Sequence, residues 1–448
     1  MPKLVTNETS EIMSAPAALG RSYQLAATGA IVWGFFTLGL LIASYGPSLL
    51  GLERQTRASV ETLTLVLTVR SVGYLLGSIL GGVLLDWYPR RGFAIIGASL
   101  VVTSAATAFV PAATTVPALA LLMSTVGFSM GTLDTIGNVL LLYLHGEGTR
   151  PWMQGLHATF AGGTLCSPLI VRASMALSAS GTNLHAAYFT FAACAGLGAS
   201  FFFGLETPPP REAASVATSE AATATARAGP AGADWRTILV AAALLGLYVG
   251  AETGFGGFLL LYATRGPTKM TEAGGQYLTA VYWGFLMVGR VAAIPLSLAV
   301  SVSAQLLANV VVCTLGVALL VAGLFTAQGD AASAGRALLW AGAAVYGLGM
   351  ASVFPSAFMQ AEALVDLTGR AASVLMVGSA FGEMAVPLLV GLVTSAWAGG
   401  FVLTVGAATL LFSLLAAALA VQRPRQAALA VADGARGVAA PLHELSFA

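Results

Sequence analysis

Charged residues are scarce in this chain of 448 residues. Asp, Glu, Lys and Arg make up 9% of it, against about 25% in soluble domains, whereas hydrophobic residues make up 57%. This shortage of charge excludes a water-soluble enzyme. The net charge of +1 also leaves no basic excess that would favour a nucleic-acid partner.

Cysteine is rare as well. Cys166, Cys194 and Cys313 lie in apolar segments, and their spacing matches neither a metal site nor a disulfide framework. No pairing of a nucleophile with a base emerges elsewhere. We therefore expect no catalytic residues, no metal centre and no cofactor.

Long apolar runs are abundant. About 20 mostly apolar residues suffice to cross the hydrocarbon core of a membrane. The runs are continuous and lack the two-residue alternation of barrel strands, so we interpret them as helices in a lipid bilayer. The twelve predicted spans cover residues 24–49, 60–86, 92–111, 116–144, 151–178, 184–205, 235–263, 273–299, 304–326, 335–361, 370–396 and 400–421.

A stretch rich in Pro, Ala, Thr and Ser divides the spans six and six. Such a division is typical of two repeated halves related by pseudo-symmetry. The predicted fold is an all-α membrane protein with two six-helix bundles. Its parts are an N-terminal tail (1–23), a first bundle (24–205), a linker (206–233), a second bundle (234–421) and a C-terminal tail (422–448).

The placement of Lys and Arg indicates the orientation. If both termini are cytoplasmic, basic residues outside the spans are twice as frequent on the cytoplasmic side as on the other, as the positive-inside rule requires. We expect a multi-pass, monomeric protein of the plasma membrane with both tails in the cytoplasm.

Polar side chains interrupt the apolar segment 127–168. Asp134 and Asn138 are four residues apart on one helical face, and Gln154 and His157 share a face of the next helix. A carboxylate at membrane depth costs about 2.5–3.5 kcal/mol on insertion scales, so it usually faces a cavity or a partner. We infer that this helix pair lines a solute path, with His157 in a structural role.

A charge cluster follows the second span. Gly82, three further residues, Asp86, and then Arg90 and Arg91 resemble the signature loop between helices 2 and 3 of the major facilitator superfamily, although Pro89 stands where glycine is usual. The resemblance implies a cytoplasmic gate formed by these residues. The simpler alternative is that the arginines only follow the positive-inside rule. The equivalent loop of the second half lacks the aspartate, so we expect the gate to depend on the first half.

Further short motifs are similar to the sodium-dependent glucose transporter branch of that superfamily, including its domain-containing-protein-4 relatives. The similarity implies alternating access by two rocking bundles, a hexose as the solute, and sodium or a proton as the coupling ion. Many solutes share this fold, so the motifs indicate the branch more strongly than the solute. They cover residues 70–77, 133–138, 153–157, 282–284, 289–290, 378–384 and 387–388.

A hexose has flat apolar patches and a belt of hydroxyl groups. An aromatic ring can lie against a patch, and amides and carboxylates can bond to the hydroxyls. For Trp283, packing is an equally good interpretation. The candidate solute-binding residues are Trp33, Thr37, Asn138, Gln154, Tyr248, Glu252, Gln276, Trp283 and Glu383.

Ion coupling needs a carboxylate at membrane depth, and Asp134, Glu252 and Glu383 meet this need. If Asp134 is protonated before the solute binds, it serves proton symport. If it stays ionised, it is a sodium ligand or an ion-pair partner of Arg70 or Arg290, which we add to the gating candidates. For Glu383 the structural alternative is a permanent ion pair with Arg290.

We therefore predict a secondary active transporter that moves a hexose or similar small polar solute by cation symport. One alternative is a transporter of another organic solute or a drug-like cation, whose charge Asp134 and Glu252 would recognise. Another is a nutrient sensor that binds solute without carrying it. The short Ala-rich linker and tails give the sensor little support.

Overall fold

The computed structural model describes residues 20–146, 149–177, 183–208, 235–327, 332–365 and 369–422, apart from the side chains of residues 150, 151, 154, 298 and 369–373. Most of the predicted linker and most of each predicted tail lie outside the described residues. Their boundaries therefore remain predictions.

The first half of the chain forms one set of helices. Ser59 caps the third of them, because its side chain accepts a hydrogen bond from the Thr62 backbone N–H at 3.3 Å. The helices are α1 (Arg21–Ile42), α2 (Tyr45–Thr56), α3 (Val60–Trp87), α4 (Gly92–Phe109), α5 (Val116–His145), α6 (Thr149–Ala176) and α7 (His185–Phe202).

The second half forms a matching set. Thr271 and Ser301 cap two of these helices, accepting hydrogen bonds from the backbone N–H groups of Gly274 and Ala304 at 3.1 and 3.3 Å. The helices are α9 (Trp235–Arg265), α10 (Glu272–Ala299), α11 (Val302–Thr326), α12 (Ala332–Met350), α13 (Val353–Leu364), α14 (Gly369–Ala396) and α15 (Gly400–Ala420).

Two predicted spans are broken, which corrects the prediction of continuous helices there. Span 24–49 is divided at residues 43–44 into α1 and α2, and span 335–361 is divided at residues 351–352 into α12 and α13. The second break is not marked by a change in hydropathy, whereas α2 is distinctly less hydrophobic than α1, which the span prediction did not take into account.

Side chains satisfy backbone groups that these breaks release. The Tyr248 hydroxyl donates to the Met350 carbonyl at 2.8 Å, and Arg290 Nε donates to the Ala351 carbonyl at 3.3 Å. Ser44 Oγ donates to the Leu41 carbonyl at 2.8 Å. Irregular backbone at membrane depth is tolerated where it is buried in protein in this way.

Ten helical stretches of the described chain are long and apolar enough to cross a membrane by length and composition alone. The predicted spans at α6 and α7 are not among them. The mean hydropathy of α6 is reduced by polar residues such as Gln154, His157 and Arg172, and that of α7 by His185, Tyr188 and Thr190. Both nevertheless pack within the first set of helices, α6 against α1 and α7 against α4.

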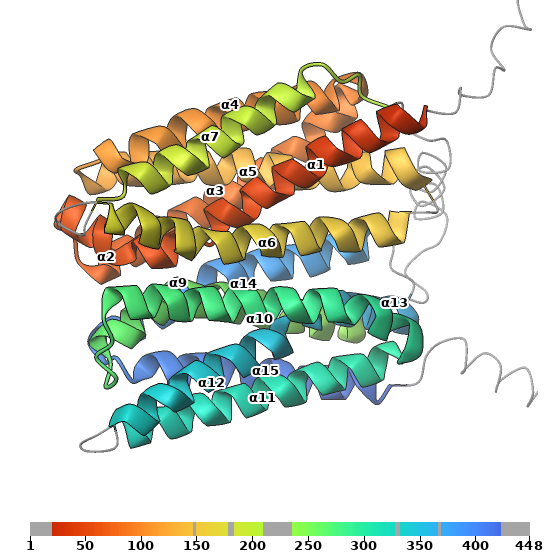
Figure 1. The fold of residues 1–448 in the computed structure, drawn as a ribbon. Helices are drawn as coiled ribbons and strands as arrows, with labels where there is room; N and C mark the ends of the chain where they lie inside the picture. The colour runs from red at the N-terminus through yellow and green to blue at the C-terminus, as the bar shows by residue number, and fades with distance from the viewer. Residues whose placement is uncertain are drawn as a thin grey trace, which may run out of the picture.

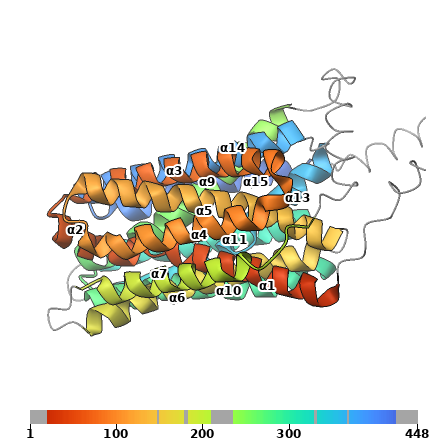
Figure 2. The same ribbon diagram turned by 90° about the horizontal axis from the view of Figure 1, so that it is seen from above.

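The two halves are stacked as two bundles (Figure 1), and the helices run roughly side by side when seen from above (Figure 2). The bundles meet mainly where α3 packs on α14 and α6 packs on α10. We call the end that holds α2 the distal end. The opposite end, where α1 begins and α15 ends, is the proximal end.

Glycines allow the closest helix crossings. A Cβ added at Gly382 of α14 would lie 1.9 Å from the Gly246 carbonyl oxygen of α9, and one at Gly77 of α3 would lie 1.8 Å from the Phe128 carbonyl oxygen of α5. Small residues are the usual means of close helix packing in membranes, where lipid tails provide no hydrophobic force between helices.

We expect Gly382→Ala to destabilise the protein by about 1–3 kcal/mol, because the added methyl group must push two backbones apart. The melting temperature of the purified protein in detergent measures this effect. Gly29→Ala is the matched control, since a Cβ at this helical position meets nothing within 4 Å. Equal melting temperatures for the two variants would contradict the proposed packing.

Candidate functional site

A cavity of about 400 Å³ lies between the two bundles. Its wall runs from Trp283 and Glu383, halfway along the bundles, to Ser297 and Met359 near the proximal end. His157, Ser297 and Met359 are exposed, so the cavity is open to solvent on the proximal side. Both bundles contribute to the wall, which is the arrangement that alternating access requires.

Asp134 reaches this cavity from α5. The Tyr74 hydroxyl of α3 donates to Asp134 Oδ2 at 2.8 Å, and Asn138 Nδ2 donates to Asp134 Oδ1 at 3.1 Å and to the Asp134 carbonyl at 2.9 Å. The predicted partners Arg70 and Arg290 pair with other carboxylates instead. Among the described residues, Asp134 is thus held by neutral donors alone.

The other two acidic candidates are paired with arginines. Arg70 Nη2 of α3 lies 3.4 Å from Glu383 Oε1 of α14, and this contact joins the two bundles. Arg290 Nη2 lies 3.1 Å from Glu252 Oε1, within the second bundle. The suggested Glu383–Arg290 pair is therefore wrong: each arginine takes the carboxylate that the helix crossing brings nearest.

Arg290 connects the cavity wall to the opposite bundle. Its Nη1 donates to the His157 carbonyl of α6 at 3.4 Å, and its guanidinium lies 5.6 Å from the centre of the Phe160 ring. His157 lines the cavity, with its ring edge-on to Phe35 at 6.3 Å between centres. His157 thus lines the cavity, and its structural role stays a prediction.

Three of the predicted solute-binding residues, Glu252, Trp283 and Glu383, line the cavity. Asn138 lies one hydrogen bond behind it, through Asp134. The side chain of Gln154 is outside the described residues. Tyr74 also lines the cavity, although it was not among the predicted site residues; it lies one helical turn after Arg70 on the same face.

Two further candidates, Trp33 and Thr37, are turned away from the cavity. Trp33 Nε1 of α1 donates to the Cys194 carbonyl of α7 at 2.9 Å, and Thr37 donates to the Trp33 carbonyl at 3.0 Å. The four-residue spacing of Trp33 and Thr37 puts them on one face of α1, but spacing alone does not indicate which neighbour that face meets. Neither residue lines the cavity, which corrects the prediction that they contact the solute there.

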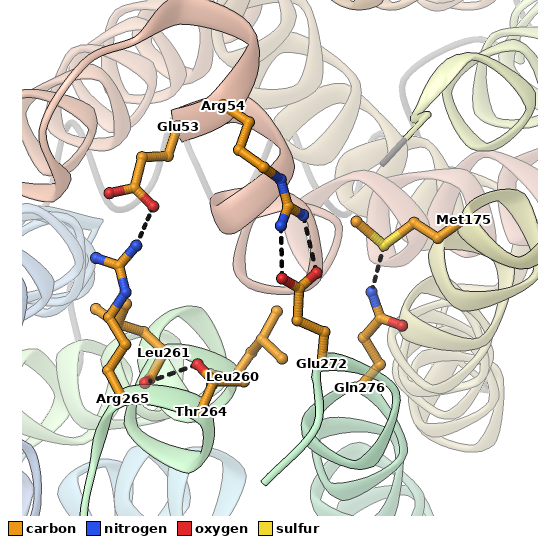
Figure 3. A network of polar contacts seen from close by, with 9 residues as sticks. All are labelled: Glu53, Arg54, Met175, Leu260, Leu261, Thr264, Arg265, Glu272 and Gln276. Atoms are coloured by element: carbon orange, nitrogen blue, oxygen red, sulfur yellow. Dashed lines mark hydrogen bonds and ion pairs between the residues drawn. The ribbon is translucent and has the colours of Figure 1, made fainter. Parts of the chain in front are cut away.

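Tyr248 and Gln276 are also buried elsewhere. Tyr248 is fully buried and supports the break between α12 and α13. Gln276 Nε2 donates to Met175 Sδ of α6 at 2.8 Å, near the distal end (Figure 3). Their polar groups are used in packing, so neither lines the cavity.

The predicted cytoplasmic gate lies at the proximal end. Asp86, Arg90 and Arg91 are exposed there, and among the described residues none of them forms an ion pair. Gly82 lies one turn before Asp86 on α3. An open proximal end agrees with an unengaged gate, and the gating role remains a prediction.

The distal end is closed by two ion pairs between the bundles (Figure 3). Neighbouring residues of α2, Glu53 and Arg54, contact Arg265 at the end of α9 and Glu272 at the start of α10. The Arg54–Glu272 pair is bidentate, at 2.5 and 2.8 Å, and its hydrogen bond raises the pKa of the Arg54 guanidinium. We call these four residues the distal latch. The latch could not be predicted from the sequence, because opposite charges on helices far apart in the chain carry no local pattern.

Two membrane bundles around a central cavity, closed at one end and open at the other, define a solute transporter. The family model of the Major Facilitator Superfamily matches residues 31–387, and the chain belongs to this superfamily. It is therefore a multi-pass membrane transporter of a small solute and not an enzyme.

Individual relatives narrow the branch. The chain is 31% identical over 372 residues to "Sodium-dependent glucose transporter 1" of Xenopus laevis, covering 79% of this chain and 72% of that protein. It is 27% identical over 441 residues to "Major facilitator superfamily domain-containing protein 4A" of Homo sapiens, covering 80% and 84%. The predicted branch is confirmed.

Solved structures agree with the fold. A D-xylose–proton symporter matches with a TM-score of 0.69 and 13% identity, over 89% of this chain and 96% of that one. The nucleoside transporter NupG matches with a TM-score of 0.64 and 14% identity, over 90% and 100%. The predicted fold of twelve membrane helices in two bundles is confirmed.

We expect Arg265→Glu to open the distal end, because it places like charges across the contact with Glu53. Exposed ion pairs contribute about 0.2–1 kcal/mol each. Replacing attraction by repulsion should therefore change the ratio of molecules open at the distal end to molecules closed there by about ten-fold. The rate at which an impermeant maleimide, added on the distal side, labels Ala43→Cys in an otherwise cysteine-free protein measures the shift. Ala43 is a buried residue between the bundles.

Restoring the pair with Glu53→Arg should return the labelling rate to its original value. Lys269→Glu serves as a matched control, because it reverses an exposed charge in the same loop that forms no ion pair among the described residues. If Lys269→Glu changes the labelling rate as much as Arg265→Glu does, the four residues do not act as a latch.

Proposed function

We propose that the protein carries a hexose or a similar polyhydroxylated solute across the plasma membrane by alternating access, with a cation moving in the same direction. The observation that carries this proposal is the cavity between the bundles, where Asp134, Glu252, Glu383 and Trp283 come together. Its volume of about 400 Å³ lies within the range of about 300–1,000 Å³ typical of small-molecule sites.

The lining suits a solute that is apolar on its faces and polar at its edge. Phe35, Phe160 and Trp283 provide aromatic surface, while Asp134 and Glu252 provide acceptors for hydroxyl groups. The likeness to a transporter named for glucose supports the same class of solute.

The arrangement of charge gives less support to a drug-like cation. Arg290 neutralises Glu252 and Arg70 neutralises Glu383, which leaves Asp134 as the acidic residue without an arginine among the described residues of the cavity. A cation-selective cavity would need more uncompensated negative charge than this.

Asp134 is the residue that we assign to cation coupling. Because only neutral donors hold its carboxylate, a proton or a sodium ion arriving there would neutralise it, and no arginine would be displaced. The carboxylate oxygens and the Tyr74 hydroxyl are the hard oxygen ligands that an alkali cation prefers. The name of the relatives favours sodium over a proton.

The orientation follows from the positive-inside rule. With both termini in the cytoplasm, the distal latch faces the outside and the cavity opens to the cytoplasm. The structure then corresponds to the state that releases solute inside the cell. We propose that a monomer completes the cycle, since each monomer has its own cavity.

We expect proteoliposomes containing the protein to accumulate labelled glucose when an inward sodium or proton gradient is imposed. Asp134→Asn should keep the shape of the site and its contacts with Tyr74 while removing the charge. Gradient-driven accumulation should therefore fall at least ten-fold, whereas exchange of glucose between equal concentrations should persist.

Glu362→Gln is the control, because Glu362 is an exposed carboxylate on α13 outside the cavity. A folded wild-type protein that carries no hexose under any gradient would disprove the proposed solute. Normal accumulation by Asp134→Asn would disprove the role of Asp134 alone.

A further inference from the structure

A second, smaller space lies beside the cavity between the same two bundles. Arg70 of α3, residues of the break between α1 and α2, and Trp283 of α10 enclose it. Its volume of about 20 Å³ has room for one water-sized group. Ile42, Thr253, Trp283 and Glu383 line both spaces, so we call it the chamber of the main cavity.

Two residues that line the chamber each carry a buried N–H group with no hydrogen-bond partner among the described residues. These groups are Arg70 Nε, on a residue that is 4% exposed, and Trp283 Nε1, on a residue that is 3% exposed. Buried donors are nearly always paired, because an unpaired one loses its hydrogen bonds to water without replacement. Two such donors beside one space point to an acceptor that occupies it.

The surrounding protein holds both donors in place. The Trp283 ring packs on Gly256 of α9, where an added Cβ would lie 2.4 Å from ring atom Cζ2, so no bulkier residue fits between them. The Arg70 side chain packs closely against Gly127 of α5, where an added Cβ would lie 3.2 Å from Arg70 Cγ. Its contact with Glu383, at 3.4 Å, is a long one and leaves Nε unused.

We propose that the chamber is a subsite for one hydroxyl group of the transported solute. The hydroxyl oxygen accepts hydrogen bonds from Arg70 Nε and Trp283 Nε1, and its proton is donated to Glu383, which lies in the same wall. A hydroxyl group can accept and donate at once, so it satisfies all three groups, whereas an ammonium group has no acceptor to offer. This inference rests on the proposed function.

Binding of the solute in the chamber would also affect how the two bundles move relative to one another. Arg70 belongs to the first bundle and Trp283 to the second, so a single hydroxyl group bonded to both holds the bundles together at this level. A ligand shifts a conformational equilibrium only through contacts that differ between the states. The chamber provides such a contact, because it exists only while the two bundles meet around it.

The test compares glucose with its monodeoxy and monofluoro analogues, using ligand-induced thermal stabilisation of the full-length protein to obtain affinities. Replacing one particular hydroxyl by hydrogen should weaken binding about ten-fold or more, since the acceptor is lost. Replacing the same hydroxyl by fluorine, which accepts but does not donate, should weaken binding less. In Trp283→Phe and in Arg70→Lys, glucose itself should bind about ten-fold more weakly, and the difference between glucose and that deoxy analogue should largely disappear.

Two matched controls separate the chamber from general effects of substitution. Trp340→Phe changes a half-buried tryptophan of α12 that lines neither space. Arg172→Lys removes another buried Nε that has no partner among the described residues, on α6 and outside the chamber. Both controls should keep the wild-type preference among the analogues.

Three other results would overturn the inference. If glucose binds but the analogue preference is the same in all variants, the chamber holds an enclosed water only, and the proposed function stands. If the two control variants lose the preference for glucose over the deoxy analogue to the same extent, the loss does not come from the chamber. If the folded wild-type protein binds no hexose at all, the proposed function fails together with this subsite.

Discussion

The cost of burying charge in a membrane organises this structure. Carboxylates and guanidinium groups at membrane depth are tolerated only where they meet partners or water. Here Arg70 meets Glu383, Arg290 meets Glu252, and Asp134 is bonded to Tyr74 and Asn138. All of them lie where the bundles face one another, so the need to neutralise charge and the need for a polar solute path are met by the same surface.

The two ends of the molecule differ because their contacts differ. At the distal end, four charges on α2, α9 and α10 join the bundles, whereas at the proximal end Asp86, Arg90 and Arg91 are exposed. Exposed ion pairs are weak individually, so such a closure can be reversed by modest binding energy. Between the ends, glycine contacts such as Gly382 on Gly246 allow helices of one bundle to pack backbone to backbone.

Much of the fold could be predicted from the sequence, because hydrocarbon thickness fixes span length and the division by the linker fixes the two halves. The cavity residues Asp134, Glu252, Trp283 and Glu383 could be identified too, since polar groups are costly in apolar helices. The pairing of Glu383 with Arg70 could not, because it depends on a crossing between helices more than 300 positions apart in sequence. Helical spacing also could not tell which aromatic faces pack inward, and Trp33 and Tyr248 were misplaced for that reason.

The most direct test of alternating access measures distances between spin labels at both ends of the molecule, with and without bound glucose. Labels at Arg57 and Lys269 report on the distal end, and labels at Trp87 and Glu362 on the proximal end, all at exposed positions. We predict that solute changes the two distances in opposite directions, one end opening as the other closes. Distances that stay constant, or that change in the same direction, would contradict two bundles turning about a central cavity.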